Sequence, residues 1–408
     1  MNGFELPWGA WYGDRMKRFP LPAGYRAVVR RIRGGRVLSP KRIDAALDAV
    51  MESPTLEQLA CSRRWAAVAV EDFSRPARLA EILPSVLRRI HAGGIPPERT
   101  RIIFALGGHA PLDRFAMIKK CGRWVCDHYD VSNHHPYEDL VDLGVSASGI
   151  PIRINRKFAE ADLRVAVGSV VPHPYAAFGG GAKIVLPGVS SIDTLEANHR
   201  PAVTGLQGGY NNIETNTARQ EMEEIALRVG LEFIVNVVTD DRRRPVGLFA
   251  GHPVAAHRAA VECARRVYAT PRPNRPADVA VLNAYPKDTE LLQVGNAFNA
   301  LRFSPPLPLK PEGIVVVTAA CSMGRGYHSL HGPGMRLYRK PVEKAYLAGR
   351  PVIFFTQNLN KCDVAVSFWD GYTFESKWNH VVKRLQKRLG HKAQIEVFPC
   401  APLQLLED

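Results

Sequence analysis

The chain has no long apolar run, few cysteines and fewer acidic than basic residues. No window of its 408 residues reaches 18 uninterrupted apolar residues, so we expect no membrane span. The first residues lack a basic stretch followed by an apolar one, so we expect no secretory signal. The seven cysteines are scattered and form no Cys-x-x-Cys pair, which argues against a disulfide framework or a zinc ribbon. These absences predict reduced thiols in a cytoplasmic protein.

The composition is that of a globular protein with a basic surface. Hydrophobic residues make up 46% and charged residues 23% of the chain, and the length predicts two or three domains. The 54 basic residues exceed the 39 acidic ones and give a net charge of +15, which attracts anions. The basic clusters are dispersed and match no nucleic-acid-binding motif. We therefore expect a small anionic molecule as the partner and disfavour nucleic acid.

Apolar strand-like runs alternate with helical patterns along the chain. Before a proline-rich stretch at 270–276, strands are predicted at 65–70, 101–106, 163–167 and 233–238, and helices at 217–229 and 254–268. After it, strands are predicted at 279–282, 314–318, 351–355 and 395–398, and helices at about 288–301, 341–348 and 375–388. This rhythm predicts two α/β domains with mostly parallel sheets and an active-site cleft between them. We expect residues 1–270 to bind the cofactor and carry the catalysis, and residues 271–408 to close over the substrate.

Chemically unusual residues follow the predicted strands of the first domain. Asp72 and Arg75 follow the first strand, His109 the second and His173 the third. Ligands of open α/β sheets bind beyond the carboxyl ends of the strands, so we expect these side chains at one edge. Each has an ordinary alternative. Arg75 can pair with Asp72 across a turn, and a lone histidine after a strand is more often structural.

The run Gly179-Gly180-Gly181 followed by Lys183 is similar to a phosphate-binding loop. It does not match the Walker A pattern, because Ala182 precedes the lysine and Ile184 follows it, and this argues against a nucleotide triphosphatase. The glycines still permit close approach of the backbone to a bound group, and Lys183 is a candidate nucleophile. His199 follows shortly after this loop.

The ordered set of motifs resembles the nickel-pincer-nucleotide-dependent lactate racemases. The matching motifs are D-x-[ST]-R-P at 72–76, G-x-H at 107–109, and H-P-x-x-x-F-x-G-G-x-K-x-x-x-P-G at 173–188, with His199 downstream. The similarity continues through 233–238, 250–257, 285–288 and Gln293, so it covers most of the chain. The resemblance implies an isomerase that inverts the C2 configuration of a 2-hydroxy acid.

The resemblance also implies a cofactor and the residues that hold it. Lys183 would carry a covalently attached pincer of the pyridinium-3,5-bisthiocarboxylic acid mononucleotide type. His199 would complete the coordination of nickel, for which imidazole is a natural ligand, and Asp72 would lie in the cofactor site. Cofactor-synthesis enzymes are then expected partners.

The same resemblance assigns the acid/base and substrate-binding groups. His109 and His173 would act on opposite faces of the substrate, and Arg75 would hold its oxygens. Removing a hydride from C2 avoids adding negative charge beside the carboxylate, but it requires a base for the hydroxyl. Imidazole suits this task because it titrates near neutral pH.

Several positions bear on the substrate. Gln293 matches the family, but the lysine expected three residues later is Asn296, and Leu292 replaces a tyrosine. An amide cannot supply the lost charge, so we expect a 2-hydroxy acid larger or more polar than lactate, such as malate or an aldonate. The polar insert 325–331 is either a surface loop or a reader of a second carboxylate or of hydroxyls. Trp378 matches an aromatic near the family's active site, with a core tryptophan as an equal alternative.

Two other functions stay open at this point. One is a different redox isomerisation with the same cofactor. The other is a basic anion- or nucleic-acid-binding protein that has lost the chemistry. The presence of His109, His173, Lys183 and His199 argues against the second.

Overall fold

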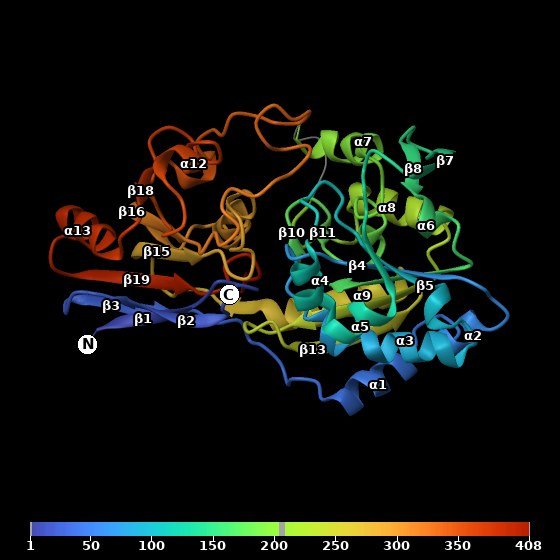
Figure 1. Cartoon of the computed structure of the whole chain (residues 1–408). Coiled ribbons are helices and arrows are strands. Elements are labelled where there is room, and N and C mark those ends of the chain that lie inside the picture. Colours follow the sequence, from blue (N-terminus) through green and yellow to red (C-terminus); the bar gives the residue numbers. More distant parts are fainter. Residues whose placement is uncertain (1, 204–208, 408) are drawn as a thin grey trace. The chain divides into compact units, whose positions relative to one another are not determined.

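The computed structural model describes residues 2–203 and 209–407, which form two compact units (Figure 1). The large unit comprises Gly35–Arg265 and Tyr327–Leu337, and the small unit comprises Met1–Gly34, Arg266–Gly326 and Tyr338–Asp408. These units differ from a single division after residue 270, because the chain enters each of them more than once. No helix within the described residues is long and apolar enough to cross a membrane.

A six-stranded sheet forms the centre of the large unit. Its strands, in spatial order, are β13 (Pro245–Gly251), β12 (Phe233–Thr239), β9 (Leu163–Ser169), β4 (Ala66–Val70), β5 (Thr100–Phe104) and β6 (Asp130–Asn133). Neighbouring strands are parallel except β12 and β13. The chain runs from β4 outward to β5 and β6, and later adds β9 and β12 on the other side. Such a reversal is where ligand sites form in open α/β sheets.

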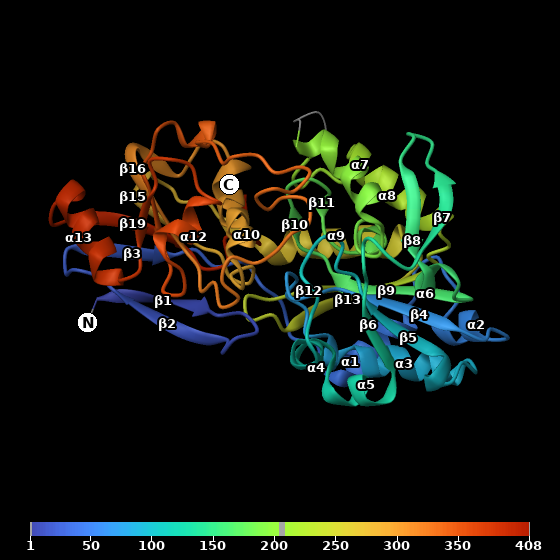
Figure 2. The same ribbon diagram turned by 45° about the horizontal axis from the view of Figure 1, so that its top comes forward.

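Helices cover both faces of this sheet, which explains why every residue of β4 is buried. The helices are α1 (Pro40–Asp48), α2 (Leu56–Ala60), α3 (Leu83–Ala92), α4 (Arg114–Cys121), α5 (Arg123–His128), α6 (Arg156–Ala159), α7 (Ile192–Val203), α8 (Thr217–Arg228) and α9 (Ala255–Tyr268). Figures 1 and 2 place α1, α3 and α5 on one side of the sheet and α6, α7 and α8 on the other. Ala67, Ala69 and Ile103 share a core with Met222 and Ile225 of α8. A short antiparallel pair, β7 (Leu140–Val145) and β8 (Pro151–Asn155), lies outside the sheet.

The small unit contains a second six-stranded sheet, and all its pairings are parallel. Its spatial order is β18 (Thr373–Glu375), β17 (Val352–Phe355), β16 (Leu309–Thr318), β15 (Ala277–Asn283), β19 (Ala393–Phe398) and β3 (Tyr25–Val29). Strand β3 comes from the start of the chain and pairs with β19, near its end. This pairing places the N-terminal residues in the small unit. The predicted mostly parallel α/β class is confirmed.

Alternate residues of β15 face two different cores, as expected for a central strand. Val279 and Val281 pack with the hairpin of β1 (Gly3–Trp8) and β2 (Arg15–Pro20) and with α13 (Trp378–Leu389). Ala280 and Leu282 pack with the segment that forms α10 (Leu291–Val294), the 3-10 turn Gly295–Phe298 and α11 (Asn299–Arg302), and with α12 (Lys361–Ala365). Both faces of the sheet are therefore covered.

Two predicted local features of the small unit are corrected. The helix predicted at 341–348 is a single 3-10 turn, Ala345–Leu347, because Ala348 takes a left-handed φ of 49° and Gly349 follows it. The stretch predicted as a linker is partly ordered as β14 (Ala269–Pro271), which pairs with β20 (Leu405–Glu407). Hydrophobic periodicity shows neither that β14 pairs with β20 nor that Ala348 takes a left-handed conformation.

Candidate active site

The residues that follow β4 and β5 meet through a carboxylate–imidazole pair. Asp72 is buried, and its Oδ2 lies 2.5 Å from Nδ1 of His109. Its Oδ1 accepts a hydrogen bond of 2.9 Å from the backbone N–H of Ser74. This contact assigns the proton of neutral His109 to Nδ1 and the lone pair to Nε2. His109 is therefore arranged to act as a base through Nε2.

The carboxyl group of Asp72 is ionised at neutral pH. Burial raises its pKa, but the charge and hydrogen bond of His109, the charge of Arg75 and the hydroxyl of Ser74 outweigh burial and hold the pKa well below its usual range. An ionised Asp72 holds the imidazole of His109 in one tautomer and one orientation. In the structure Asp72 contacts the candidate base His109. That Asp72 also lies in the cofactor site stays a prediction.

A buried ion pair fixes the loop that carries Asp72. Lys120 Nζ lies 2.9 Å from Glu71 Oε1 and donates a second bond of 2.9 Å to the carbonyl of Arg75. Glu71 also accepts from the hydroxyl of Ser169 at the end of β9, at 2.7 Å. Burial lowers the pKa of Lys120, while the adjacent Glu71 favours its charged form. This network ties the ends of two strands to α4.

The side chain of Arg75 extends along the same loop. Its Nη1 donates to the hydroxyl of Ser74 at 2.9 Å and to the carbonyl of Ser74 at 3.2 Å. In the part of the chain that the structure describes, Arg75 forms no ion pair with Asp72, so the alternative of a simple cross-turn pair is not seen. Its role in holding substrate oxygens stays a prediction.

His173 lies beyond the end of β9 and has the opposite hydrogen-bonding pattern to His109. It belongs to β10 (Pro172–His173), which pairs with β11 (Ala177–Phe178). Its Nδ1 accepts from the backbone N–H groups of Tyr175, at 3.2 Å, and Ala176, at 3.1 Å. Neutral His173 therefore carries its proton on Nε2 and is a hydrogen-bond donor there. The two candidate acid/base residues are chemically distinct in this conformation.

The glycine run is explained by packing inside the protein. Gly180 and Gly181 have φ values of 74° and 56°, and a Cβ on them would lie 2.7 Å from Asn236 Oδ1 and 2.9 Å from the ring of His257. The backbone N–H of Gly181 donates to Asn236 at 3.0 Å, and His257 Nε2 donates to the carbonyl of Gly179 at 2.8 Å. The glycines were predicted to let the backbone approach a bound group. At Gly180 and Gly181 the backbone instead approaches protein side chains, those of Asn236 and His257.

A buried arginine holds the same loop from α8. The guanidinium of Arg219 donates to the carbonyls of Gly180 at 3.2 Å, Ala176 at 3.4 Å and Phe178. Burial lowers the pKa of Arg219 to about 10, so it stays charged at neutral pH. Arg219, Asn236 and His257 were not predicted as site residues. For Asn236 the signal was a polar residue inside an apolar strand, and Arg219 had no comparable signal.

Lys183 and His199, two of the three residues with predicted cofactor roles, interact electrostatically. Lys183 is only 7% exposed, on the 3-10 turn Gly181–Ile184. His199 lies on α7, and its Nδ1 donates to the carbonyl of Leu195 at 3.1 Å. Burial lowers the pKa of His199 well below its usual value, and the charge of Lys183 lowers it further. A neutral imidazole whose Nδ1–H binds a carbonyl is the form that ligates metals through Nε2.

Two further histidines join this group from the polar insert. Ring centroids are separated by 5.2 Å between His109 and His328, 4.6 Å between His328 and His331, and 6.3 Å between His331 and His199. Burial lowers the pKa of both inserted histidines. The insert thus contributes side chains next to the candidate base. Across residues 2–203 and 209–407, no group of three or more His, Cys, Asp or Glu side chains is placed to hold a metal ion.

Comparison with known proteins shows what this arrangement resembles. Residues 12–207 match the lactate racemase N-terminal domain, a segment that includes Asp72, His109, His173, Lys183 and His199. The chain is therefore similar to the lactate racemases over the segment that carries these residues. The resemblance stated from the motifs is confirmed, and so is the expectation of an isomerase, since racemases are isomerases.

The curated relatives are lactate racemases, and solved structures have a similar fold. The chain is 29% identical over 295 residues to the lactate racemase of Lactiplantibacillus plantarum, a match that covers 71% of this chain and 68% of the relative. It is 28% identical over 335 residues to the lactate racemase of Thermoanaerobacterium thermosaccharolyticum, covering 80% and 76%. The fold is similar to the lactate racemase apoprotein of the latter organism, with a TM-score of 0.76 at 22% identity over 100% of both chains. A Thermotoga maritima protein gives a TM-score of 0.66 at 17% identity, covering 92% of this chain and 100% of that one.

The position at which this chain departs from the pattern of the lactate racemases lies in the small unit. Asn296 Nδ2 donates to the backbone carbonyl of Gln293 at 2.8 Å. Its Oδ1 accepts from Nζ of Lys287 at 3.3 Å, and Lys287 is buried. An ammonium group therefore lies beside the amide that replaces the family's lysine.

Trp378 has the environment of a core residue. Its indole Nε1 donates to the carbonyl of Pro20 at 2.8 Å. Its ring packs edge-on against Phe19, with centroids 4.8 Å apart, and against Phe355 at 5.5 Å. These contacts belong to the alternative of a core tryptophan, and its role in substrate binding stays a prediction.

Proposed function

We propose that this protein is a racemase or epimerase that inverts the C2 configuration of a 2-hydroxy acid larger or more polar than lactate, a class that includes malate and the aldonates. Its curated relatives are named lactate racemases. The observation that carries the proposal is the pair of Asp72 and His109, in which a buried carboxylate fixes the base form of a histidine at the carboxyl edge of the sheet.

The residues present suit a covalently held cofactor. Lys183 is a buried amine at the end of a loop that Arg219 and His257 hold by its carbonyl groups. His199 is neutral and offers Nε2 as a ligand. We therefore assign the attachment of the pincer to Lys183 and the nickel ligand to His199. When bound, the nickel-pincer cofactor would supply the hydride acceptor for C2.

The side chains of this protein would handle the protons and the orientation of the substrate. His109 Nε2 takes the proton of the C2 hydroxyl, and Asp72 stabilises the imidazolium that forms. Arg75 pairs with the substrate oxygens. His173 donates a hydrogen bond through Nε2 to the oxygen on the opposite face. For His173 to act as the base, its ring must release the two backbone N–H groups, so the two directions of inversion are not equivalent.

The position of Asn296 supports a substrate other than lactate. Its amide accepts from Lys287 and donates to the backbone and the side chain of Gln293, so a neutral group that is already hydrogen-bonded stands where the family has a cation. The loss of that cation weakens the binding of a small acid that depends on its carboxylate, and favours a larger acid with further binding groups.

The test is to produce the protein together with cofactor-synthesis enzymes, and to assay 2-hydroxy acids by chiral chromatography. We expect nickel, an added mass on Lys183 and inversion at C2, with Lys183→Ala losing the added mass and the activity together. Full activity in metal-free protein without the added mass would contradict the proposal. Conversion of a substrate without change at C2 would indicate a different redox isomerisation.

A further inference from the structure

We infer that a pocket beside His109 receives the substituent on C2 of the substrate and selects an uncharged, largely apolar substituent over a second carboxylate. The inference rests on the proposed function and ranks the substrates within it. The pocket has a volume of about 350 Å³ and lies entirely in the large unit. Because His109 lines it, a substrate whose hydroxyl reaches this base has its C2 substituent at the pocket.

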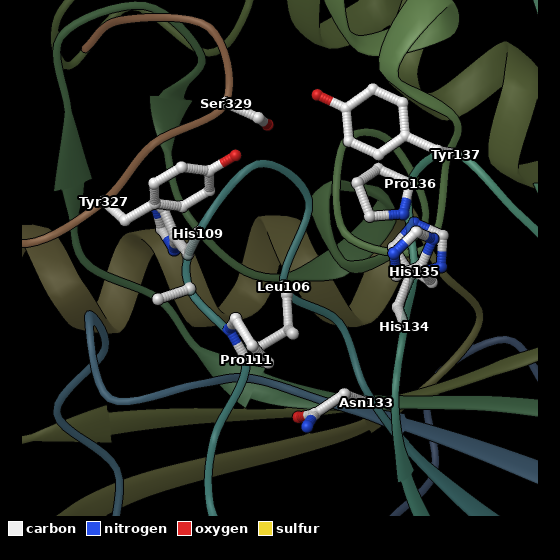
Figure 3. A pocket seen from close by; sticks show the side chains of 11 residues that line it. Leu106, His109, Pro111, Asn133, His134, His135, Pro136, Tyr137, Tyr327 and Ser329 are labelled. Carbon is white, nitrogen blue, oxygen red and sulfur yellow. The ribbon is translucent and has the colours of Figure 1, made fainter.

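The walls of the pocket are mainly apolar and aromatic. Leu106, Pro111 and Pro136 line it, together with Tyr137 and Tyr327. Figure 3 shows the two tyrosine rings on opposite sides of the space, with their hydroxyl groups turned toward the region between them. Walls of this kind bind a flat or branched hydrocarbon group by removing apolar surface from water.

The polar side chains in the pocket are mostly committed elsewhere. The amide of Asn133 exchanges hydrogen bonds of 3.2 and 2.9 Å with the backbone of Leu112. His134 Nε2 bonds the carbonyl of Ser190 at 2.8 Å. The ring of His135 and the hydroxyl groups of Tyr137, Tyr327 and Ser329 also line the pocket, and the hydroxyl of Ser329 donates to the carbonyl of Gly108 at 3.3 Å. The hydroxyl groups are neutral, so they can bond a hydroxyl of the substrate but cannot balance a charge.

No lysine or arginine is among the described residues that line the pocket. A carboxylate that entered it would lose water without gaining the permanent charge of a lysine or arginine, which is unfavourable in an apolar site. A dicarboxylate such as malate is therefore expected to be a poorer substrate than an aryl-bearing acid. The pocket therefore distinguishes malate from an aryl-bearing acid, which the replacement of the family's lysine by Asn296 does not do by itself.

The position of Tyr327 relative to His109 is fixed by the segment that carries it. Ser329 donates from its backbone N–H to the carbonyl of Gly108 at 2.8 Å, next to the candidate base. At the other end of the segment, Arg336 forms ion pairs of 2.7 Å with Asp193 and 2.9 Å with Glu196 on α7. The insert that carries Tyr327 thus builds one wall of the pocket.

The experiment compares kcat/KM of the cofactor-loaded enzyme for lactate, malate, gluconate and 3-phenyllactate. We expect 3-phenyllactate to be best and malate at least tenfold worse. Tyr327→Ala should lower the value for 3-phenyllactate at least tenfold and that for lactate less than threefold. Tyr137→Arg adds a cation and should raise the malate-to-phenyllactate ratio at least tenfold. Phe115→Ala, which removes an exposed aromatic outside the pocket, is the matched control. It should leave unchanged both the kcat/KM for 3-phenyllactate and the malate-to-phenyllactate ratio.

Two kinds of result would overturn the pocket assignment. Malate or gluconate as the best substrate would do so, and so would a Tyr137→Arg enzyme with an unchanged ratio. Calorimetric titration of 3-phenyllactate into wild-type and Tyr327→Ala protein separates this inference from the proposed function. Binding that is lost in the variant supports the pocket even if no acid is inverted, and equal binding by both proteins contradicts it.

Discussion

The carboxylate of Asp72 accepts the Nδ1–H of His109 across 2.5 Å, and this one contact decides which nitrogen of the imidazole is basic. The pair joins the ends of two adjacent parallel strands. Its geometry therefore depends on the register of the sheet as well as on the two side chains.

Asp72→Asn is expected to lower kcat by at least about 100-fold with little change in KM, because an amide can donate to Nδ1 and stabilise the wrong tautomer. Ser74→Ala leaves the pair intact and should cost less than about tenfold. Equal losses in both variants would contradict a special role for the carboxylate.

The buried pair of Lys120 and Glu71 should be indispensable to stability. Lys120→Met removes the cation that is paired with the buried Glu71, at a cost of about 3–5 kcal/mol in the free energy of unfolding. Lys119→Met, on the neighbouring exposed position, should change it by less than about 0.5 kcal/mol. Urea unfolding measures both. A Lys120→Met protein as stable as the Lys119→Met control would show that Glu71 is protonated or hydrated.

Arg219 should be needed for attachment at Lys183. In Arg219→Lys one ammonium cannot reach three carbonyl groups, so the loop before Lys183 should loosen and the free energy of unfolding fall by about 2 kcal/mol. Mass spectrometry should find less of the Lys183 adduct than in wild type. Arg228→Lys, on the exposed face of the same helix, is the control. Full adduct formation in Arg219→Lys would contradict this role.

The stability of the protein should fall in mild acid because His134 is buried in its neutral form. Burial lowers the pKa of His134 to about 4, below the value of about 6.5 for the unfolded chain. The stability contributed by this group is complete above about pH 6.5 and is lost as the pH falls toward 4, by on the order of 3 kcal/mol. Unfolding free energies measured from pH 7 to 4 should fall less steeply in His134→Gln. Parallel curves for the two proteins would refute the assignment.

Asn296→Lys should shift preference toward short monocarboxylates, and the structure adds a cost to this change. The new ammonium would face Lys287, which now donates to Asn296 at 3.3 Å. We expect the kcat/KM ratio of lactate to gluconate to rise about tenfold and stability to fall by about 1 kcal/mol. Asn296→Met has similar size without charge and should not raise the ratio. A rise of equal size in both variants would mean that charge is not the cause.

Much of the fold follows from local patterns in the sequence. The apolar runs at 66–70, 163–167 and 233–238 are neighbouring strands, and the residues after β4, β5 and β9 lie at one edge as the strand order requires. Such runs are readable because a strand buried on both faces is apolar throughout. The pairing of β3 with β19 is not readable, since its partners lie at opposite ends of the chain.

The site was predicted less completely than the fold. His109, His173, Lys183 and His199 could be named as candidates because they sit in motifs. Arg219 was missed because a fully buried arginine looks like any helical arginine in a sequence. The roles of His328 and His331 depend on where the insert docks, which is set by contacts such as Ser329 with Gly108 and by no local pattern.

The insert and the residues that follow it, up to Leu337, also bear on how the protein folds during synthesis. Leu330 and Leu337 complete an apolar cluster with Ile192 and Leu195 of α7, yet they are translated more than a hundred residues later. During synthesis the apolar side of α7 therefore stays uncovered until the ribosome has passed residue 337. A fragment that ends at Arg265 would expose the same surface permanently and is expected to aggregate.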